Sequence, residues 1–140
     1  MAGSPSPPRE WLRKARQDLR SARLLSTSRG LSGPACFHAQ QAVEKALKAV
    51  AAHLGATDIP RTHSLLELAQ LISDWGGQTP WPLEELAGLD RFAVDVRYPR
   101  APEPGPAAAD KALRMAQRVC RWARQQTRPR PRGGPKPAPA

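Results

Sequence analysis

The fold is decided by the stretch Ala35-Cys36-Phe37-His38-Ala39-Gln40-Gln41-Ala42-Val43-Glu44-Lys45-Ala46-Leu47-Lys48-Ala49, which has the composition and periodicity of one helix. Alanine, leucine and glutamine lose little rotamer freedom in a helix, so this composition favours helix strongly. Apolar side chains recur at three- and four-residue steps from Ala39 to Val50, which lines one face. Gly55 follows as a stop signal. We therefore predict a helix over residues 34–53 whose small apolar side chains let neighbouring helices come close.

Polar side chains form a second stripe on the same helix. Phe37, Gln41, Glu44 and Lys48 are spaced by four, three and four residues, which puts them on one face. Gln40 flanks that face and can reach Glu44. Such a stripe could form hydrogen bonds across a helix–helix seam, or it could hold a base edge or a phosphate. The spacing alone favours a plainer interpretation, an ordinary polar face with pairs four residues apart.

The rest of the chain shows the same helical periodicity and no strand signal. We predict further helices over residues 8–25, 64–74, 82–96 and 107–126, with Ser64 and Glu67 as a capping box for the second of these. The helix from Pro82 should stop near Arg97, because Tyr98 precedes a proline and is pushed out of the helical region. The predicted fold is all-α, an up-and-down bundle of four to five helices over residues 9–126. Residues 1–8 are expected to be a disordered lead-in, and residues 127–140 a disordered basic tail rich in proline and arginine.

Positive charge gathers toward the two ends of the chain. The formal net charge is +10, with seven basic and two acidic residues in 1–29 and nine and one in 110–140. Residues 30–109 have six basic and nine acidic groups. A basic chain attracts polyanions, so affinity for nucleic acid is expected at the first helix, the last helix and the tail. The alternative is a solvated arginine-rich surface without a ligand.

Several classes of protein find no support in the composition. Cys36 and Cys120 do not make a disulfide framework, so we expect two reduced, buried thiols. No apolar run suits a membrane span and no signal peptide is recognisable, so no membrane partner and a cytoplasmic location are expected. The sequence has no metal-ligand spacing, no glycine-rich phosphate loop and no nucleophile elbow. We accordingly assign no catalytic residue, no metal ligand and no cofactor.

Two short segments could contact an anion. In Asp95-Val96-Arg97-Tyr98-Pro99, the guanidinium of Arg97 could bind phosphate in a bidentate manner beside the only tyrosine. The alternative is a structural corner in which Arg97 covers helix carbonyls and Tyr98 packs as a plug. Arg61-Thr62-His63-Ser64 precedes a predicted helix N-terminus, where free N–H groups attract anions. His63 could shuttle a proton there or simply cap the helix, and the second is favoured for a lone histidine.

These motifs together resemble a known family. The run from Cys36 to Ala49 is similar to the signature helix of HEPN domains, and Thr62-His63-Ser64-Leu65 is similar to the Thr-His-Asp-Leu segment that follows it. Val96-Arg97-Tyr98-Pro99 resembles the Arg-Tyr-Pro corner of the same family, and the resemblance spans residues 9–126. It implies a helical bundle that is often a homodimer. Many members accompany a minimal nucleotidyltransferase, and some branches are ribonucleases, including toxins of toxin–antitoxin pairs.

The ribonuclease branches have an arginine followed by a histidine after four to six residues. None of the three histidines here has an arginine at that distance, and Lys48 before His53 is the nearest substitute. Lysine lacks the planar fork that binds phosphate in two places, so ribonuclease activity is disfavoured. Arg100 also departs from the family pattern, since an acidic residue often follows the Arg-Tyr-Pro corner.

The leading hypothesis is a non-catalytic HEPN-type accessory module that binds a nucleotide of the ATP or GTP class, RNA, or a partner minimal nucleotidyltransferase. One alternative is a ribonuclease or toxin with His63 or His53 as base and Arg97 nearby. Another is a homodimeric interaction protein with nonspecific nucleic-acid affinity, its polar stripe serving as the dimer seam. The predicted binding residues are Gln40, Gln41, Glu44, Lys45, Lys48, His63, Asp95, Arg97 and Tyr98.

Overall fold

The structure is a computed structural model, and it describes residues 6–129. These residues form five α-helices and two short 3₁₀ helices, with no strand among them. The prediction of an all-α helical bundle is therefore confirmed. The expectations for residues 1–5 and 130–140 lie outside the described residues.

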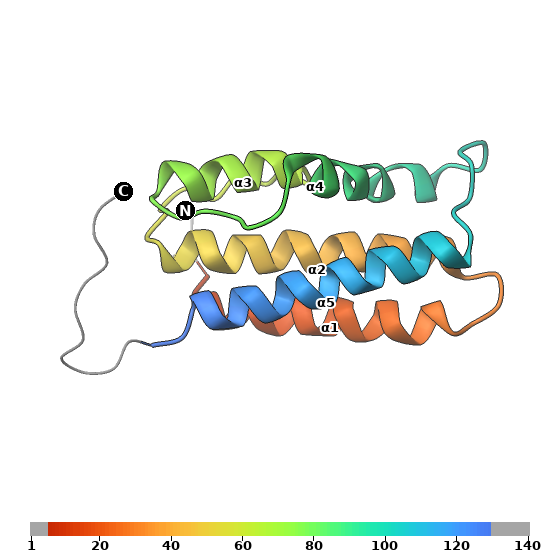
Figure 1. The fold of residues 1–140 in the computed structure, drawn as a ribbon, viewed down its shortest axis with the longest axis horizontal. Coiled ribbons are helices and arrows are strands. Elements are labelled where there is room, and N and C mark those ends of the chain that lie inside the picture. Colours follow the sequence, from red (N-terminus) through yellow and green to blue (C-terminus); the bar gives the residue numbers. More distant parts are fainter. Residues whose placement is uncertain (1–5, 130–140) are drawn as a thin grey trace.

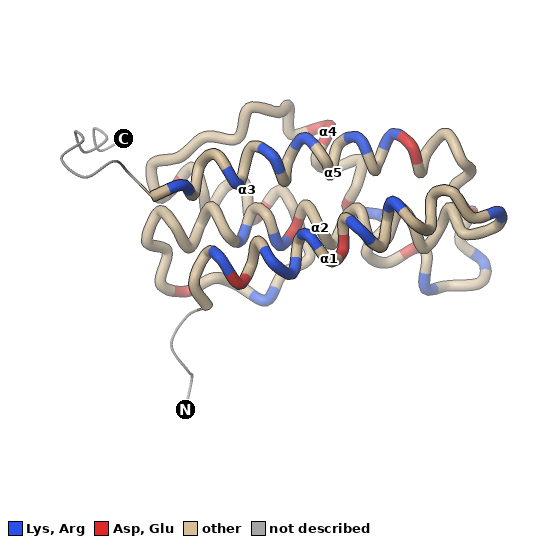
Figure 2. The backbone as a smooth tube through the Cα atoms, turned by 90° about the horizontal axis from the view of Figure 1, so that it is seen from below, with Lys and Arg blue, Asp and Glu red and all other residues tan. Residues whose placement is uncertain are grey.

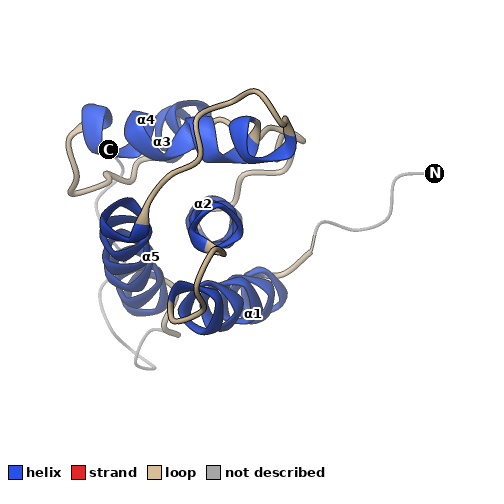
Figure 3. Ribbon diagram, turned by 90° about the vertical axis from the view of Figure 1, so that its right-hand side faces the viewer, coloured by secondary structure: helices blue, strands red, loops and turns tan. Residues whose placement is uncertain are grey.

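Three long helices make the body of the bundle. They are α1 (Pro8–Ser26), α2 (Ser32–His53) and α5 (Pro106–Gln126). Figure 1 shows that α1 and α2 run in opposite directions and that α5 returns alongside them. Seen from the end, α2 lies in the middle, between α1 and α5 on two sides and the shorter helices on a third (Figure 3). Proline begins α1 and α5 because a first-turn residue needs no N–H donor.

The third side of α2 is covered by α3 (Leu65–Asp74). Only one of the two hydrogen bonds of the predicted capping box forms at the start of this helix. The hydroxyl of Ser64 accepts a hydrogen bond from the Glu67 N–H at 3.3 Å. The Ser64 N–H donates to Thr62 Oγ1 at 3.0 Å instead of to Glu67, so the reciprocal bond is missing. This helix begins where His63 meets the middle of α2 and ends where Trp75 lies against Gly55.

Glycine ends both α2 and α3 in the same way. Gly55 has a positive φ of 101°, its N–H reaches Ala52 O at 3.1 Å, and the next N–H reaches Ala51 O at 3.1 Å. Gly76, with φ of 90°, plays the same part after α3. This is the Schellman arrangement, in which the left-handed residue satisfies carbonyls that the helix leaves free. The predicted stop at Gly55 is confirmed.

The prediction of one continuous helix over residues 82–96 is wrong. The chain forms α4 (Leu83–Asp90) and then two 3₁₀ turns, η1 (Arg91–Ala93) and η2 (Asp95–Arg97). Leu86, Leu89 and Phe92 are all buried and recur every three residues. A helix with three residues per turn keeps such a repeat in line, whereas an α-helix rotates it away from the core. Leu86 and Leu89 lie in α4 itself, and Phe92 stays buried as the chain tightens after Asp90.

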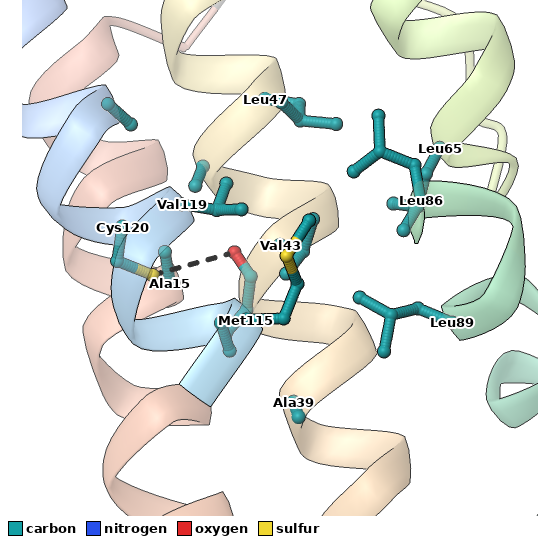
Figure 4. Close-up of a cluster of buried hydrophobic side chains, with 14 of the residues drawn as sticks. Ala15, Ala39, Val43, Leu47, Leu65, Leu86, Leu89, Met115, Val119 and Cys120 are labelled. Atoms are coloured by element: carbon teal, nitrogen blue, oxygen red, sulfur yellow. Dashed lines mark hydrogen bonds between the residues drawn. The ribbon is translucent and has the colours of Figure 1, made fainter. Parts of the chain in front are cut away.

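The core lies on both sides of α2. In Figure 4 two of its side chains, Val43 and Leu47, lie between α5 and the shorter helices. The residues labelled around them are Met115 and Val119 on α5, Leu65 at the start of α3, and Leu86 and Leu89 on α4.

Both cysteines are free and buried, as predicted. The Sγ of Cys120 lies 4.0 Å from the carbonyl oxygen of Ala42, which joins α5 to α2. Burial raises the pKa of the Cys36 thiol to about 11 and that of Cys120 to about 12. Both groups are thus un-ionised at neutral pH, and a thiol in that state is a poor nucleophile.

Candidate functional site

The polar stripe of α2 is buried within a single chain. Gln41, Glu44 and Lys48 are only 8%, 3% and 7% exposed, and Gln40 is fully buried. The plainer interpretation holds in part, because Glu44 and Lys48 form the expected pair four residues apart, but the face is buried instead of exposed. Burying charges without partners costs several kcal/mol, so each of these groups must find a partner inside the bundle.

The carboxylate of Glu44 is the partner of most of these groups. Its Oε1 lies 2.6 Å from Nδ1 of His63, and its Oε2 accepts from the Lys48 ammonium at 3.3 Å. The Gln41 amide donates to Gln40 Oε1 at 2.7 Å and lies 3.5 Å from Glu44 Oε1. Gln40 in turn donates to the backbone carbonyl of His63 at 2.9 Å. These contacts tie α2 to the segment before α3 through one connected network.

His63 is the exposed end of this network. Its side chain is 57% exposed, whereas that of Glu44 is 4% exposed. When Nδ1–H donates to a carboxylate, the tautomer is fixed and Nε2 is left as an acceptor facing away from it. The interpretation of His63 as a helix cap is wrong, because Ser64 is the cap and the imidazole contacts Glu44. The arrangement can offer an oriented imidazole to a ligand.

At the other end of the network, Lys48 lies under the first helix. Its ammonium is 5.3 Å from the centroid of the Trp11 ring, a cation–π distance. The indole Nε1 of Trp11 is buried and has no hydrogen-bond partner. Trp11 therefore closes the network from the side of α1, a role that the sequence pattern of α1 did not indicate.

Lys45 belongs to a different cluster from the other predicted binding residues. Its ammonium pairs with Asp18 of α1, and Nδ1 of His38 lies 2.9 Å from the same carboxylate. Asp18 thus joins α1 to α2 through two partners that lie seven residues, or about two turns, apart on α2. Sequence reasoning missed Asp18 because its partners, 20 and 27 residues away, are brought to it only by the pairing of the two helices.

The segment 95–98 lies farther along the same stripe. The Arg97 guanidinium lies 5.2 Å from the centroid of the Phe37 ring, and Phe37 is one turn from Gln41 on the shared face of α2. Tyr98 is 61% exposed, so the interpretation of it as a packed plug is wrong. Asp95 is half-buried at the start of η2. Among the described residues, no hydrogen bond or ion pair links this segment to Glu44 or His63.

The predicted anion site at the start of α3 is occupied by the protein's own carboxylate. Asp90 Oδ1 accepts from the Leu65 N–H at 2.9 Å, and Ser64 accepts from Glu67. Burial raises the pKa of Asp90, and the hydrogen bonds from Leu65 and Gln40 oppose that rise in part. An external anion would have to displace Asp90, so the exposed groups His63 and Arg97 are the better candidates for ligand contact.

Within residues 6–129, no three His, Cys, Asp or Glu side chains gather closely enough to hold a metal ion. In the same residues no helix is both long and apolar enough to cross a membrane.

The five helices, the signature helix and the Arg-Tyr-Pro corner together define a HEPN domain. The family model described as HEPN domain matches residues 8–126, and the chain belongs to this family.

Two solved structures are similar to it. TT1696 from Thermus thermophilus is 32% identical with a TM-score of 0.66, covering 85% of this chain and 97% of that one. ST0689, described as an archaeal HEPN homologue, is 27% identical with a TM-score of 0.65, covering 89% of this chain and 100% of that one. No curated protein matches the sequence.

Proposed function

We propose that this HEPN domain is a non-catalytic accessory module that binds a nucleotide of the ATP or GTP class. The observation that carries the proposal is the contact between buried Glu44 and exposed His63, at 2.6 Å. A buried carboxylate that orients an exposed imidazole is typical of a group held ready for a ligand. The lysine under Trp11 and the two glutamines hold Glu44 in place, so the imidazole is fixed before any ligand arrives.

Arg97 supports a phosphate-bearing ligand. It lies over Phe37, seven residues before Glu44 on the same face of α2, which is about 10 Å along the helix axis. Its side chain has no carboxylate partner among the described residues. A guanidinium binds phosphate through a planar fork, while the imidazole of His63 and the phenol of Tyr98, the residue after Arg97, suit a base or a ribose. Arg97 and His63 thus offer two chemically different contacts to one elongated ligand.

A partner minimal nucleotidyltransferase is the other ligand that this surface suits. A protein partner would use the same exposed imidazole, guanidinium and phenol, because the amides and Lys48 are buried. The homodimer expected from the family resemblance remains a prediction. The polar stripe does not need a second copy of the chain, since its hydrogen bonds close within one protomer.

The proposal is tested by isothermal titration calorimetry with ATP and GTP. We expect His63→Ala and Arg97→Ala each to weaken binding about tenfold, the effect of losing roughly one charge-assisted hydrogen bond. His53→Ala and Arg100→Ala are matched controls, because both residues are exposed and lie outside the site. Unchanged affinity in both site variants would contradict the assignment.

The same proteins also test the non-catalytic part of the proposal. We expect total RNA to stay intact during incubation with micromolar wild-type protein. Cleavage that disappears in His63→Ala would favour the ribonuclease alternative instead, since the oriented imidazole could then act as a general base.

A further inference from the structure

The two most basic helices of the chain lie side by side. α1 contains six Lys or Arg and two acidic residues, and α5 contains five and one. In Figure 2 the blue positions concentrate along these two helices, which cross the near side of that view. The positive charge expected on the terminal helices therefore meets at the seam between α1 and α5.

A groove of about 330 Å³ follows this seam. Its charged lining is Arg16 and Arg23 from α1 with Arg121 and Arg124 from α5, and no acidic residue lines it. Apolar side chains such as Leu12 and Leu19 also line it, half-buried between the helices. An adjoining hollow of about 420 Å³ shares Leu12, Arg121 and Arg124 and adds Arg128. Because the two hollows share these three lining residues, we refer to them together as the α1–α5 channel.

The arginines of this channel have no carboxylate partners among the described residues. Every ion pair in residues 6–129 uses a lysine or a histidine as its cation. Asp18, the acidic residue nearest the middle of α1, is engaged with His38 and Lys45 instead. Four like charges around one groove repel each other, and a bound anion would relieve that repulsion.

The shape of the channel selects the kind of anion. Leu12 lies near Arg124, and Arg23 is eleven residues farther along α1, so the charges extend over about 16 Å. A strand that kept the helical rise of about 3.4 Å per nucleotide would place about five phosphates along that length, and a more extended strand would place fewer, so the channel matches several linked nucleotides. The exposed guanidiniums can also stack on unpaired bases. A bilayer suits the channel poorly, because its apolar residues are half-buried between the helices.

We propose that the α1–α5 channel binds the backbone of a single-stranded nucleic acid independently of base sequence. This site is separate from the one proposed for a nucleotide. Trp11 and Asp18 lie seven residues apart and both contact side chains of α2, Lys48 and Lys45 respectively, whereas Arg16 and Arg23 form another seven-residue pair that lines the channel. The two pairs are offset by five residues, which is about 140° around the helix.

The test is fluorescence anisotropy with a labelled single-stranded RNA of about ten nucleotides, long enough to exceed the channel. The full chain is compared with the double variant Arg16→Gln/Arg121→Gln. The matched control, Arg13→Gln/Arg20→Gln, removes the same total charge, in this case from two exposed positions of α1 outside the channel. We expect the channel variant to weaken binding about tenfold or more and to lower the slope of log K against log salt by about 1.4. The control should weaken binding clearly less than the channel variant does, because its arginines lie outside the channel.

Three outcomes would overturn the proposal. Equal losses in the two double variants would mean that diffuse charge, and not the channel, attracts the RNA. Absence of RNA binding by the wild-type chain at low salt would exclude single-stranded nucleic acid as the ligand of the channel. Tighter binding to phosphatidylserine vesicles than to RNA would assign the channel to a membrane surface. The variants His63→Ala and Arg97→Ala should leave RNA affinity unchanged, so the nucleotide proposal can fail without affecting this one.

Discussion

At the scale of single residues, several polar and charged side chains of α2 are buried inside the bundle. Glu44 is 3% exposed, and its carboxylate contacts His63, Lys48 and Gln41. Buried polar networks are stabilising only when every member is satisfied, because a partner left alone keeps its full desolvation cost. The sequence placed these residues on one face of a helix, yet their spacing favoured an ordinary polar face over a buried seam. Burial by α1 and by the segment before α3 decided between the two.

Removing Glu44 tests how much the network contributes. We expect Glu44→Ala to lower the free energy of unfolding by about 3 kcal/mol, because Lys48 is then buried without its anion. The measurement is urea denaturation followed by circular dichroism. The double variant Glu44→Leu/Lys48→Met should recover most of that loss, since an apolar pair of similar volume needs no partner. A double variant as unstable as the single one would mean that packing, and not the unpaired charge, causes the loss.

At the scale of elements, helix ends were predicted well and helix continuity less well. Proline at the start of α1, serine before α3 and glycine after α2 all act as local signals, and each is confirmed. The last helix begins at Pro106, one residue before its predicted start. The region after Asp90 was predicted as α-helix because its apolar residues fit a helical period. After Asp90 the chain winds as 3₁₀ turns with Phe92 buried in the core, and such tertiary burial is not visible in a local pattern.

Two glycine substitutions should have opposite effects on stability. Gly55→Ala is expected to cost about 1 kcal/mol, because its φ of 101° suits residues without a Cβ. Gly88→Ala should stabilise by about 0.5–1 kcal/mol, since this exposed glycine lies within α4 and a Cβ would meet nothing within 4 Å. Thermal unfolding of the two variants beside the wild type measures both. Changes of the same sign would contradict the backbone argument.

At the scale of the whole molecule, α2 is the axis around which the other helices pack (Figure 3). Ala39, Ala42 and Ala46 have no exposed surface at all. Small side chains let helices approach closely, and a core packed at crystal-like density has no room for added methylenes. The alanine-rich composition of α2 thus sets the spacing of the bundle and the width of the seams at its surface.

Enlarging one of these alanines should disturb the whole bundle. We expect Ala46→Leu to destabilise the protein by about 1–3 kcal/mol through overpacking. Ala87→Leu, at an exposed position of α4, should stay within about 0.5 kcal/mol of the wild type. Chemical denaturation of both variants provides the comparison. An Ala46→Leu protein as stable as the control would show unfilled space beside α2.

The all-α class, the helix ends and the family followed from the sequence, because helix propensity, capping and motif spacing are local properties of the chain. The exposure of His63 beside buried Glu44, the separate pairing of Lys45 with Asp18, and the arginine channel did not follow from it. Each depends on which faces of two helices meet, and that is determined by packing between residues far apart in the chain. Charge counts indicated that α1 and α5 were basic, whereas their lateral contact brought Arg16 and Arg121 to one groove.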